Sequence, residues 1–107
     1  MIEEPAADGG TPPKGTRVYG FVPQGAWAEY VVATPKMMTP IPDGVETVQA
    51  ASLPVAAVTA LAALESAGTL LGRKVLVTGA AGGVGRYACQ LAHLGGAHVY
   101  AVSRPRA

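Results

Sequence analysis

The 107-residue sequence has little charge and a single cysteine, Cys89. Charged residues make up 14% of it, and eight Lys/Arg against seven Asp/Glu leave a net charge of +1. That balance excludes a typical nucleic-acid-binding protein, because such proteins cluster a large excess of basic residues. One cysteine forms neither a disulfide framework nor a four-ligand zinc site, so we predict no metal and a reducing, cytoplasmic setting.

Long apolar runs are also lacking. The N-terminal residues 1–5 are acidic and do not resemble a signal peptide. Residues 47–64 carry no charge, but they are rich in alanine and are interrupted by Pro54. A membrane-spanning helix needs about 20 strongly apolar residues, so we predict no membrane segment. Half of all residues are nevertheless apolar, which excludes an intrinsically disordered chain.

Proline is almost confined to the first half of the chain, where eight of the nine prolines lie at or before Pro54. Because proline interrupts helices and donates no hydrogen bond to a sheet, we expect loops, turns and edge strands there. Residues 17–22 and 27–32 are predicted strands, and residues 39–44 are a predicted turn. Thr47 is expected to cap a short helix that ends near residue 53.

The second half predicts longer regular elements. A helix is expected over residues 55–67, with Pro54 in its first turn and a glycine after its end. Residues 74–78 and 98–102 are continuous and apolar, as buried parallel strands are. Between these strands, apolar residues from Val84 to Ala92 recur at helical spacing. A strand, a helix and a strand within about 30 residues form a βαβ unit, which predicts an α/β fold with a parallel sheet.

The most informative segment is Thr78–Gly85, a glycine-rich stretch between the first of these strands and the helix. The free N–H groups and the dipole of a helix N-terminus bind a diphosphate, and glycines let the backbone approach it. We predict that Ala81, Gly82, Gly83 and Val84 bind a dinucleotide, and that the last three donate backbone N–H groups. The alternative is a glycine-rich turn without a ligand.

Two glycine spacings fit this segment. Counted from Ala80, it follows the Rossmann fingerprint with the first glycine replaced by alanine. Counted from Thr78, it follows the spacing of short-chain dehydrogenases. Either spacing is weak alone, but both predict nucleotide binding once a strand, a helix and a second strand surround them.

The residues after the second strand bear on the choice of cofactor. NAD-binding sites have an acidic residue there, whereas this chain has Ser103, Arg104, Pro105 and Arg106. A hydroxyl and a guanidinium bind a 2′-phosphate that a carboxylate would repel. We therefore predict NADP(H), with Ser103 and Arg104 on the 2′-phosphate. The alternative is that Arg104 and Arg106 are solvated charges near the chain end.

Several motifs follow one another along the chain in the order found in the medium-chain dehydrogenase/reductases, which they resemble. They are Gly15–Val18, Gly25–Tyr30, Leu53–Pro54 with Thr59–Ala60, and Gly72–Gly85. The last motif resembles the quinone-oxidoreductase-like branch of that family. The resemblance implies that residues 1–53 are the C-terminal part of a GroES-like substrate domain. Residues 54–107 are then the N-terminal half of a Rossmann domain. Thr59 is implied to lie near the nicotinamide. Its alternative role is a hydroxyl bonded within its own helix.

Two departures from the family pattern bear on metal and branch. Zinc-dependent alcohol dehydrogenases of the family have a cysteine ligand where this chain has Val55, and a four-cysteine lobe where it has a short connection. The resemblance therefore implies the zinc-independent branch. Short-chain enzymes have the glycine motif near the N-terminus, whereas in this chain it starts at Thr78. The resemblance therefore favours the medium-chain family over the short-chain enzymes.

The resemblance implies part of an NADPH-dependent oxidoreductase that transfers hydride to a quinone, an enone or a similar activated double bond of a small molecule. A complete Rossmann domain needs about six strands, so we expect a fragment that is inactive alone. The whole protein is expected to be a homodimer with subunits of about 300 residues. Alternatives are the enoyl-reductase module of a fatty-acid or polyketide synthase, a short-chain-type reductase and a non-catalytic nucleotide-binding protein. No catalytic residue is predicted.

Overall fold

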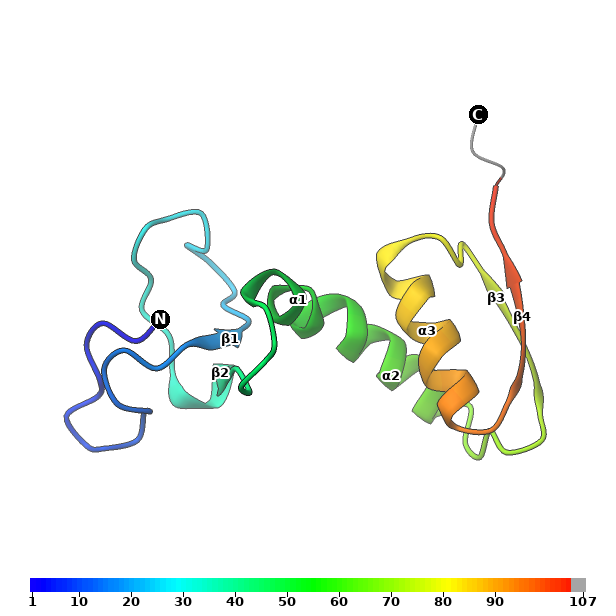
Figure 1. Cartoon of the computed structure of the whole chain (residues 1–107), viewed down its shortest axis with the longest axis horizontal. Coiled ribbons are helices and arrows are strands. Elements are labelled where there is room, and N and C mark those ends of the chain that lie inside the picture. The colour runs from blue at the N-terminus through cyan, green and yellow to red at the C-terminus, as the bar shows by residue number, and fades with distance from the viewer. Residues whose placement is uncertain (105–107) are drawn as a thin grey trace. The chain divides into compact units, whose positions relative to one another are not determined.

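The computed structural model describes residues 1–104. The chain divides into two compact units, Met1–Pro54 and Val55–Ala107. In Figure 1 the first unit runs from the blue N-terminus into the green, and the second continues toward the red end. None of the helices within the described residues has both the length and the apolar character that a bilayer crossing requires.

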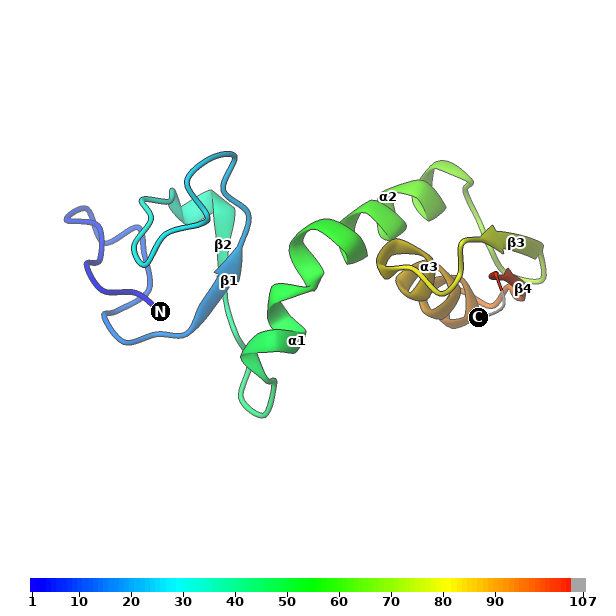
Figure 2. The same ribbon diagram turned by 90° about the horizontal axis from the view of Figure 1, so that it is seen from above.

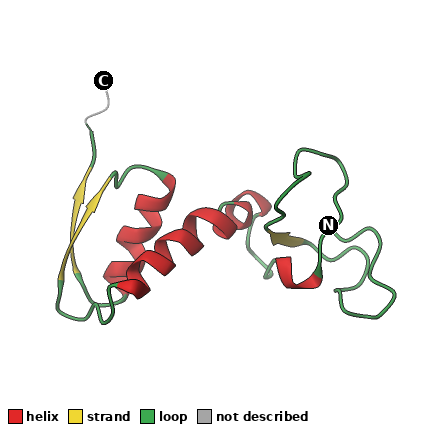
Figure 3. Ribbon diagram, turned by 180° about the vertical axis from the view of Figure 1, so that it is seen from behind, coloured by secondary structure: helices red, strands yellow, loops and turns green. Residues whose placement is uncertain are grey.

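The first unit contains a two-stranded antiparallel sheet, one 3-10 turn and one short helix (Figure 3). The strands pair with Tyr19 opposite Thr39. Arg17 links the sheet to the helix, since its guanidinium donates to Thr47 Oγ1 at 3.3 Å and to the Val45 carbonyl at 3.2 Å. The elements are β1 (Val18–Gly20), η1 (Pro35–Met37), β2 (Met38–Pro40) and α1 (Thr47–Ala51).

Two strand predictions for this unit are wrong in part. The first strand is shorter than the predicted residues 17–22, and residues 27–32 form no strand. The partner of β1 is β2, whose last two residues lie in the predicted turn 39–44. A strand forms only where another backbone satisfies its N–H and C=O groups, and β2 supplies that ladder. Pro40 is tolerated because it ends a strand at the edge of the sheet.

The predicted cap of the short helix is wrong by one residue. Thr47 is the first helical residue, and Glu46 is the N-cap. The backbone N–H of Glu46 donates to Gln49 Oε1 at 3.4 Å, so this helix starts with a capping box instead of a threonine cap.

The second unit is a βαβ unit preceded by a helix (Figure 2), which confirms the predicted α/β fold with a parallel sheet. Both predicted strands have the predicted bounds. The predicted helix over residues 55–67 is π-helical around Pro54, which has no N–H to donate, and then becomes α-helical. The elements are η2 (Leu53–Ala57), α2 (Val58–Ser66), β3 (Lys74–Thr78), α3 (Gly83–Leu94) and β4 (His98–Val102).

Helix α3 covers one face of the β3–β4 sheet (Figure 1). Val75 lies opposite Val99, and both are half-buried. Leu76 lies opposite Tyr100, and these side chains are 64% and 54% exposed. Since neighbouring residues of a strand point to opposite faces, the valines face α3 and the other pair faces away from it.

Helix α2 packs along α3 through small side chains. Ala60 of α2 and Ala92 of α3 have no exposed surface, and alanines of this kind let two helices approach closely. The C-terminal end of α2 is held by Arg73, whose Nη1 donates to the Ala67 carbonyl at 2.8 Å. A cation at this end also complements the negative end of the helix dipole. Strand β3, which begins directly after Arg73, is therefore linked to α2 as well as to α3.

Candidate cofactor site

The glycine-rich segment forms a tight corner between β3 and α3. Gly79, directly after the last residue of β3, has a φ of +67°, a conformation that favours glycine. The backbone N–H of Gly82 donates to the Gly79 carbonyl at 2.9 Å, which closes a turn. Gly82 is also the N-cap of α3, in an extended conformation. The corner thus has the strand, turn and helix order that a dinucleotide motif requires.

Four backbone N–H groups of this corner are free in the described part of the chain: those of Ala81, Gly83, Val84 and Gly85. The first three helical residues of α3 contribute three of them, because N–H groups in the first turn of a helix have no partner within it. These donors lie at the positive end of the helix dipole. The arrangement fits an anion with several oxygens.

One predicted donor already has a partner within the corner. The N–H of Gly82 is bonded to the Gly79 carbonyl and is not available to a ligand. Gly82 can still contribute to a cofactor site because it has no side chain to occupy the corner. A Cβ at this position would lie 3.3 Å from the Gly79 carbonyl oxygen, which is a tight contact.

Gly85 completes the corner in a way that the sequence prediction did not include. A Cβ on Gly85 would contact the Gly79 carbonyl and would lie 2.8 Å from Ala80 Cα, closer than real side chains come. Only glycine therefore fits where α3 passes the end of β3, which is the packing role of the third glycine in the fingerprint. That spacing was the signal that could have identified it. At Gly83, by contrast, a Cβ would make an ordinary contact of 3.8 Å with Ala56 Cβ.

Ser103 and Arg104 directly follow β4 and are exposed. The preceding residue, Val102, accepts a hydrogen bond from the Ala80 N–H at 3.0 Å, so β4 ends beside the glycine corner. Parallel strands bring their carboxyl ends to one edge, and ligands of open α/β sheets bind at that edge. The structure therefore brings Ser103 and the corner to the same edge of the sheet. Arg106 lies outside the described residues.

Thr59 lies on α2 and is exposed. Its hydroxyl forms no hydrogen bond within residues 1–104, so the alternative of a bond within its own helix is not what the structure contains. Ala56, one turn earlier, is the residue near Gly83. Val55 has no metal-binding group, and the described residues contain no group of three His, Cys, Asp or Glu that could hold a metal ion.

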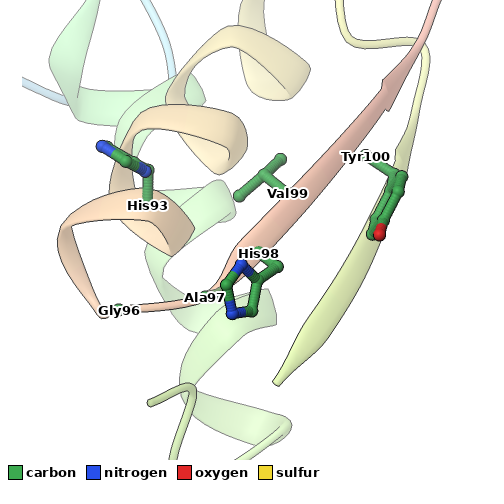
Figure 4. Close-up of a pocket in the computed structure, with 6 residues that line it drawn as sticks. All are labelled: His93, Gly96, Ala97, His98, Val99 and Tyr100. Carbon is green, nitrogen blue, oxygen red and sulfur yellow. The ribbon is translucent and has the colours of Figure 1, made fainter. Parts of the chain in front are cut away.

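A separate hollow of about 480 Å³ lies at the other end of β4 (Figure 4). The hollow lies beside His98, the first residue of β4. The cofactor corner lies beside Val102, the last residue of the same strand. Figure 4 shows the ring of His93 turned away from His98, so the two do not converge on one point. The hollow is lined by His93, Gly96, Ala97, His98, Val99 and Tyr100.

Comparison with known proteins shows what the chain is similar to. A chloroplast envelope quinone oxidoreductase homolog from Arabidopsis thaliana is 50% identical over 88 residues, which are 77% of this chain and 27% of that protein. A mycocerosic acid synthase-like polyketide synthase from Mycobacterium tuberculosis is 38% identical over 90 residues, 83% of this chain and 4% of that protein. No protein-family model matches the chain.

Among solved structures, the quinone oxidoreductase from Thermus thermophilus superposes with a TM-score of 0.75 and 42% identity, covering 80% of this chain and 30% of that one. A complex of that enzyme with NADPH is described. The chain matches the quinone-oxidoreductase-like branch of the medium-chain dehydrogenase/reductases. Other structural neighbours in this superfamily include enoyl reductases and a zinc-bound alcohol dehydrogenase. Within the family, the chain spans about a quarter to a third of the length of the quinone oxidoreductases it matches.

Proposed function

We propose that this chain is part of an NADP(H)-dependent oxidoreductase that reduces a quinone, an enone or a similar activated double bond. The observation that carries the proposal is the set of free N–H groups at the start of α3, in a corner where Gly85 leaves no room for a side chain. Such a corner suits the diphosphate of a dinucleotide. When bound, the nicotinamide supplies the hydride.

The proposed residues bind different parts of the cofactor. The N–H groups of Ala81, Gly83 and Val84 are free to donate to the diphosphate, and Gly82 leaves space for it. Ser103 and Arg104 are proposed to bind the 2′-phosphate, because both are exposed at the same sheet edge. Charge-assisted bonds from a guanidinium are stronger than neutral ones, so Arg104 should dominate the preference for NADPH.

We further propose that residues 1–53 belong to a GroES-like substrate domain and residues 54–107 to a Rossmann domain. The division into the units Met1–Pro54 and Val55–Ala107 supports a boundary near Pro54. Thr59 is proposed to lie near the nicotinamide, which its exposed and unpaired hydroxyl permits. Val55 supports a reaction without zinc, in which binding and orientation of the cofactor supply most of the catalysis. A small-molecule substrate, a homodimer and a cytoplasmic location stay predictions.

Cofactor titration of the full-length protein tests this proposal. NADPH is expected to bind more tightly than NADH. Quinones and enones are expected to be reduced with NADPH as the hydride donor. Tighter binding of NADH, or equal binding of the two, would contradict the assignment of Ser103 and Arg104. Binding of NADPH without turnover on a broad panel of quinones and enones would support a non-catalytic nucleotide-binding protein.

A second candidate is the enoyl-reductase module of a fatty-acid or polyketide synthase. The match to the polyketide synthase from Mycobacterium tuberculosis favours it, because it covers most of the chain. The two candidates differ in substrate. Reduction of enoyl thioesters in preference to free quinones by the full-length protein would select the second candidate.

A further inference from the structure

A basic side chain lies on the same turn as the free N–H groups. Arg86 is exposed in the first turn of α3, three residues after Gly83 and four after Gly82. Residues three and four apart share one face of a helix, and helical side chains lean toward the N-terminus. The Arg86 side chain is long enough to reach back over the corner from this position. Gly82 and Gly83 have no side chains to obstruct it.

The charge of Arg86 has no partner in the described residues. Its guanidinium forms no hydrogen bond, and the ion pair found within residues 1–104 joins Lys14 to Glu3 instead. The second unit is poor in acidic residues, since Glu65 is the only Asp or Glu after Pro54, against five of the eight Lys/Arg. A cation in the first turn of a helix is also unfavourable, because it faces the positive end of the dipole. An anionic ligand would remove both costs.

We propose that Arg86 is a further cofactor-binding residue, whose guanidinium pairs with the diphosphate of the dinucleotide. This inference rests on the proposed function and extends it to a residue outside the glycine fingerprint. The diphosphate is common to NADH and NADPH, so Arg86 strengthens the binding of both. Arg104 differs from it, since the 2′-phosphate is present only in NADPH.

Lys74 offers a matched control for the loss of one positive charge. It is exposed at the first residue of β3, at the end of the strand away from the corner. At about 3.3 Å per residue, the four steps to Thr78 separate it from the corner by roughly 13 Å, which exceeds the screening length at physiological salt. Long-range attraction by the basic unit would be weakened by loss of either charge, whereas a local contact would be weakened only by loss of Arg86.

The test compares Arg86→Gln and Lys74→Gln in the full-length protein, with dissociation constants for NADH and NADPH measured at low and high salt. Arg86→Gln is expected to weaken both cofactors by roughly tenfold and to reduce the salt dependence of binding, with Arg86→Lys keeping part of the affinity. Lys74→Gln is expected to change neither constant by more than about twofold. The melting temperature without cofactor should not fall in Arg86→Gln, since an unfavourable charge is removed.

Three results would overturn the inference. These are unchanged affinity in Arg86→Gln, an equal loss in Lys74→Gln, or a loss restricted to NADPH. In each of these the wild-type protein still binds a dinucleotide, so the proposed function survives. Failure of the wild-type protein to bind either cofactor would overturn the proposed function, and this inference with it.

Discussion

The backbone N–H of Ala80 donates to the carbonyl oxygen of Val102 at 3.0 Å. This bond joins the glycine loop after β3 to the last residue of β4, and Ser103 and Arg104 follow directly. Two groups of predicted cofactor residues, well separated in sequence, therefore begin at one edge of the sheet. A dinucleotide needs this proximity, because its diphosphate and its adenosine ribose are adjacent parts of one molecule.

Replacement of Arg104 by glutamine should separate the two cofactors. We expect Arg104→Gln to weaken NADPH binding by roughly tenfold, because one charge-assisted bond to the 2′-phosphate is lost. NADH lacks this phosphate and serves as the control, with an unchanged dissociation constant. Fluorescence titration of both cofactors measures the effect. An equal loss for NADH would mean that Arg104 does not act on the 2′-phosphate.

Gly85 and Gly83 provide a matched pair for the packing of the corner. Gly85→Ala places a Cβ 2.8 Å from Ala80 Cα, so we expect a loss of about 1–3 kcal/mol in the free energy of unfolding. Gly83→Ala makes only an ordinary contact with Ala56, and its stability should stay within about 1 kcal/mol of the wild type. Denaturant unfolding of the full-length protein measures both. Equal stability of the two variants would contradict the close approach at Gly85.

The elements of the second unit were predictable because their signals are local. Runs of apolar and β-branched residues define β3 and β4, and glycines with positive φ at Gly68 and Gly96 follow the helices before them. The apolar spacing between Val84 and Ala92 predicted α3. The π-helical turn around Pro54 was not readable, since the same residues fit a regular first turn.

The first unit was less predictable because its strand pairing is not local. Residues 27–32 have the apolar character of a strand, yet no described backbone pairs with them, and Trp27 is fully exposed. Pairing of β1 with β2 depends instead on a chain reversal through η1, which brings the Met37 carbonyl to the Phe21 N–H at 3.0 Å. Composition alone favours a turn over residues 39–44, because two prolines, an aspartate and a glycine lie in it.

The cofactor corner shows the same limit on a smaller scale. The glycine spacing predicted the place of the site, but not which N–H groups are free. That depends on a single turn bond, from the Gly82 N–H to the Gly79 carbonyl. This bond closes a four-residue turn, and the turn depends on the backbone angles of Ala80 and Ala81, which the sequence permits but does not require.

A graded series at Gly82 tests whether an absent side chain makes room for the diphosphate. Gly82→Ala adds a Cβ 3.3 Å from the Gly79 carbonyl oxygen, so we expect a modest loss of affinity for both cofactors. Gly82→Val adds a branched side chain and should weaken both by more than about a hundredfold, as several phosphate bonds are lost together. Calorimetric titration measures the series, and circular dichroism checks that α3 is retained. Unchanged affinity in Gly82→Val would place the diphosphate elsewhere.

Thr59 is the residue whose proposed role depends most on the complete protein. Thr59→Val keeps the shape of the side chain and removes its hydroxyl, and since the residue is exposed the free energy of unfolding should change by less than about 0.5 kcal/mol. If the hydroxyl orients the nicotinamide, the rate of hydride transfer should fall by roughly tenfold, while the dissociation constant for NADPH changes little. Thr59→Ser, which keeps the hydroxyl, should retain most of the rate. Single-turnover measurements under saturating cofactor separate these effects. Equal rates in Thr59→Val and the wild type would show that the hydroxyl has no part in hydride transfer. No structural role would then remain for it either, since it forms no hydrogen bond within the described residues.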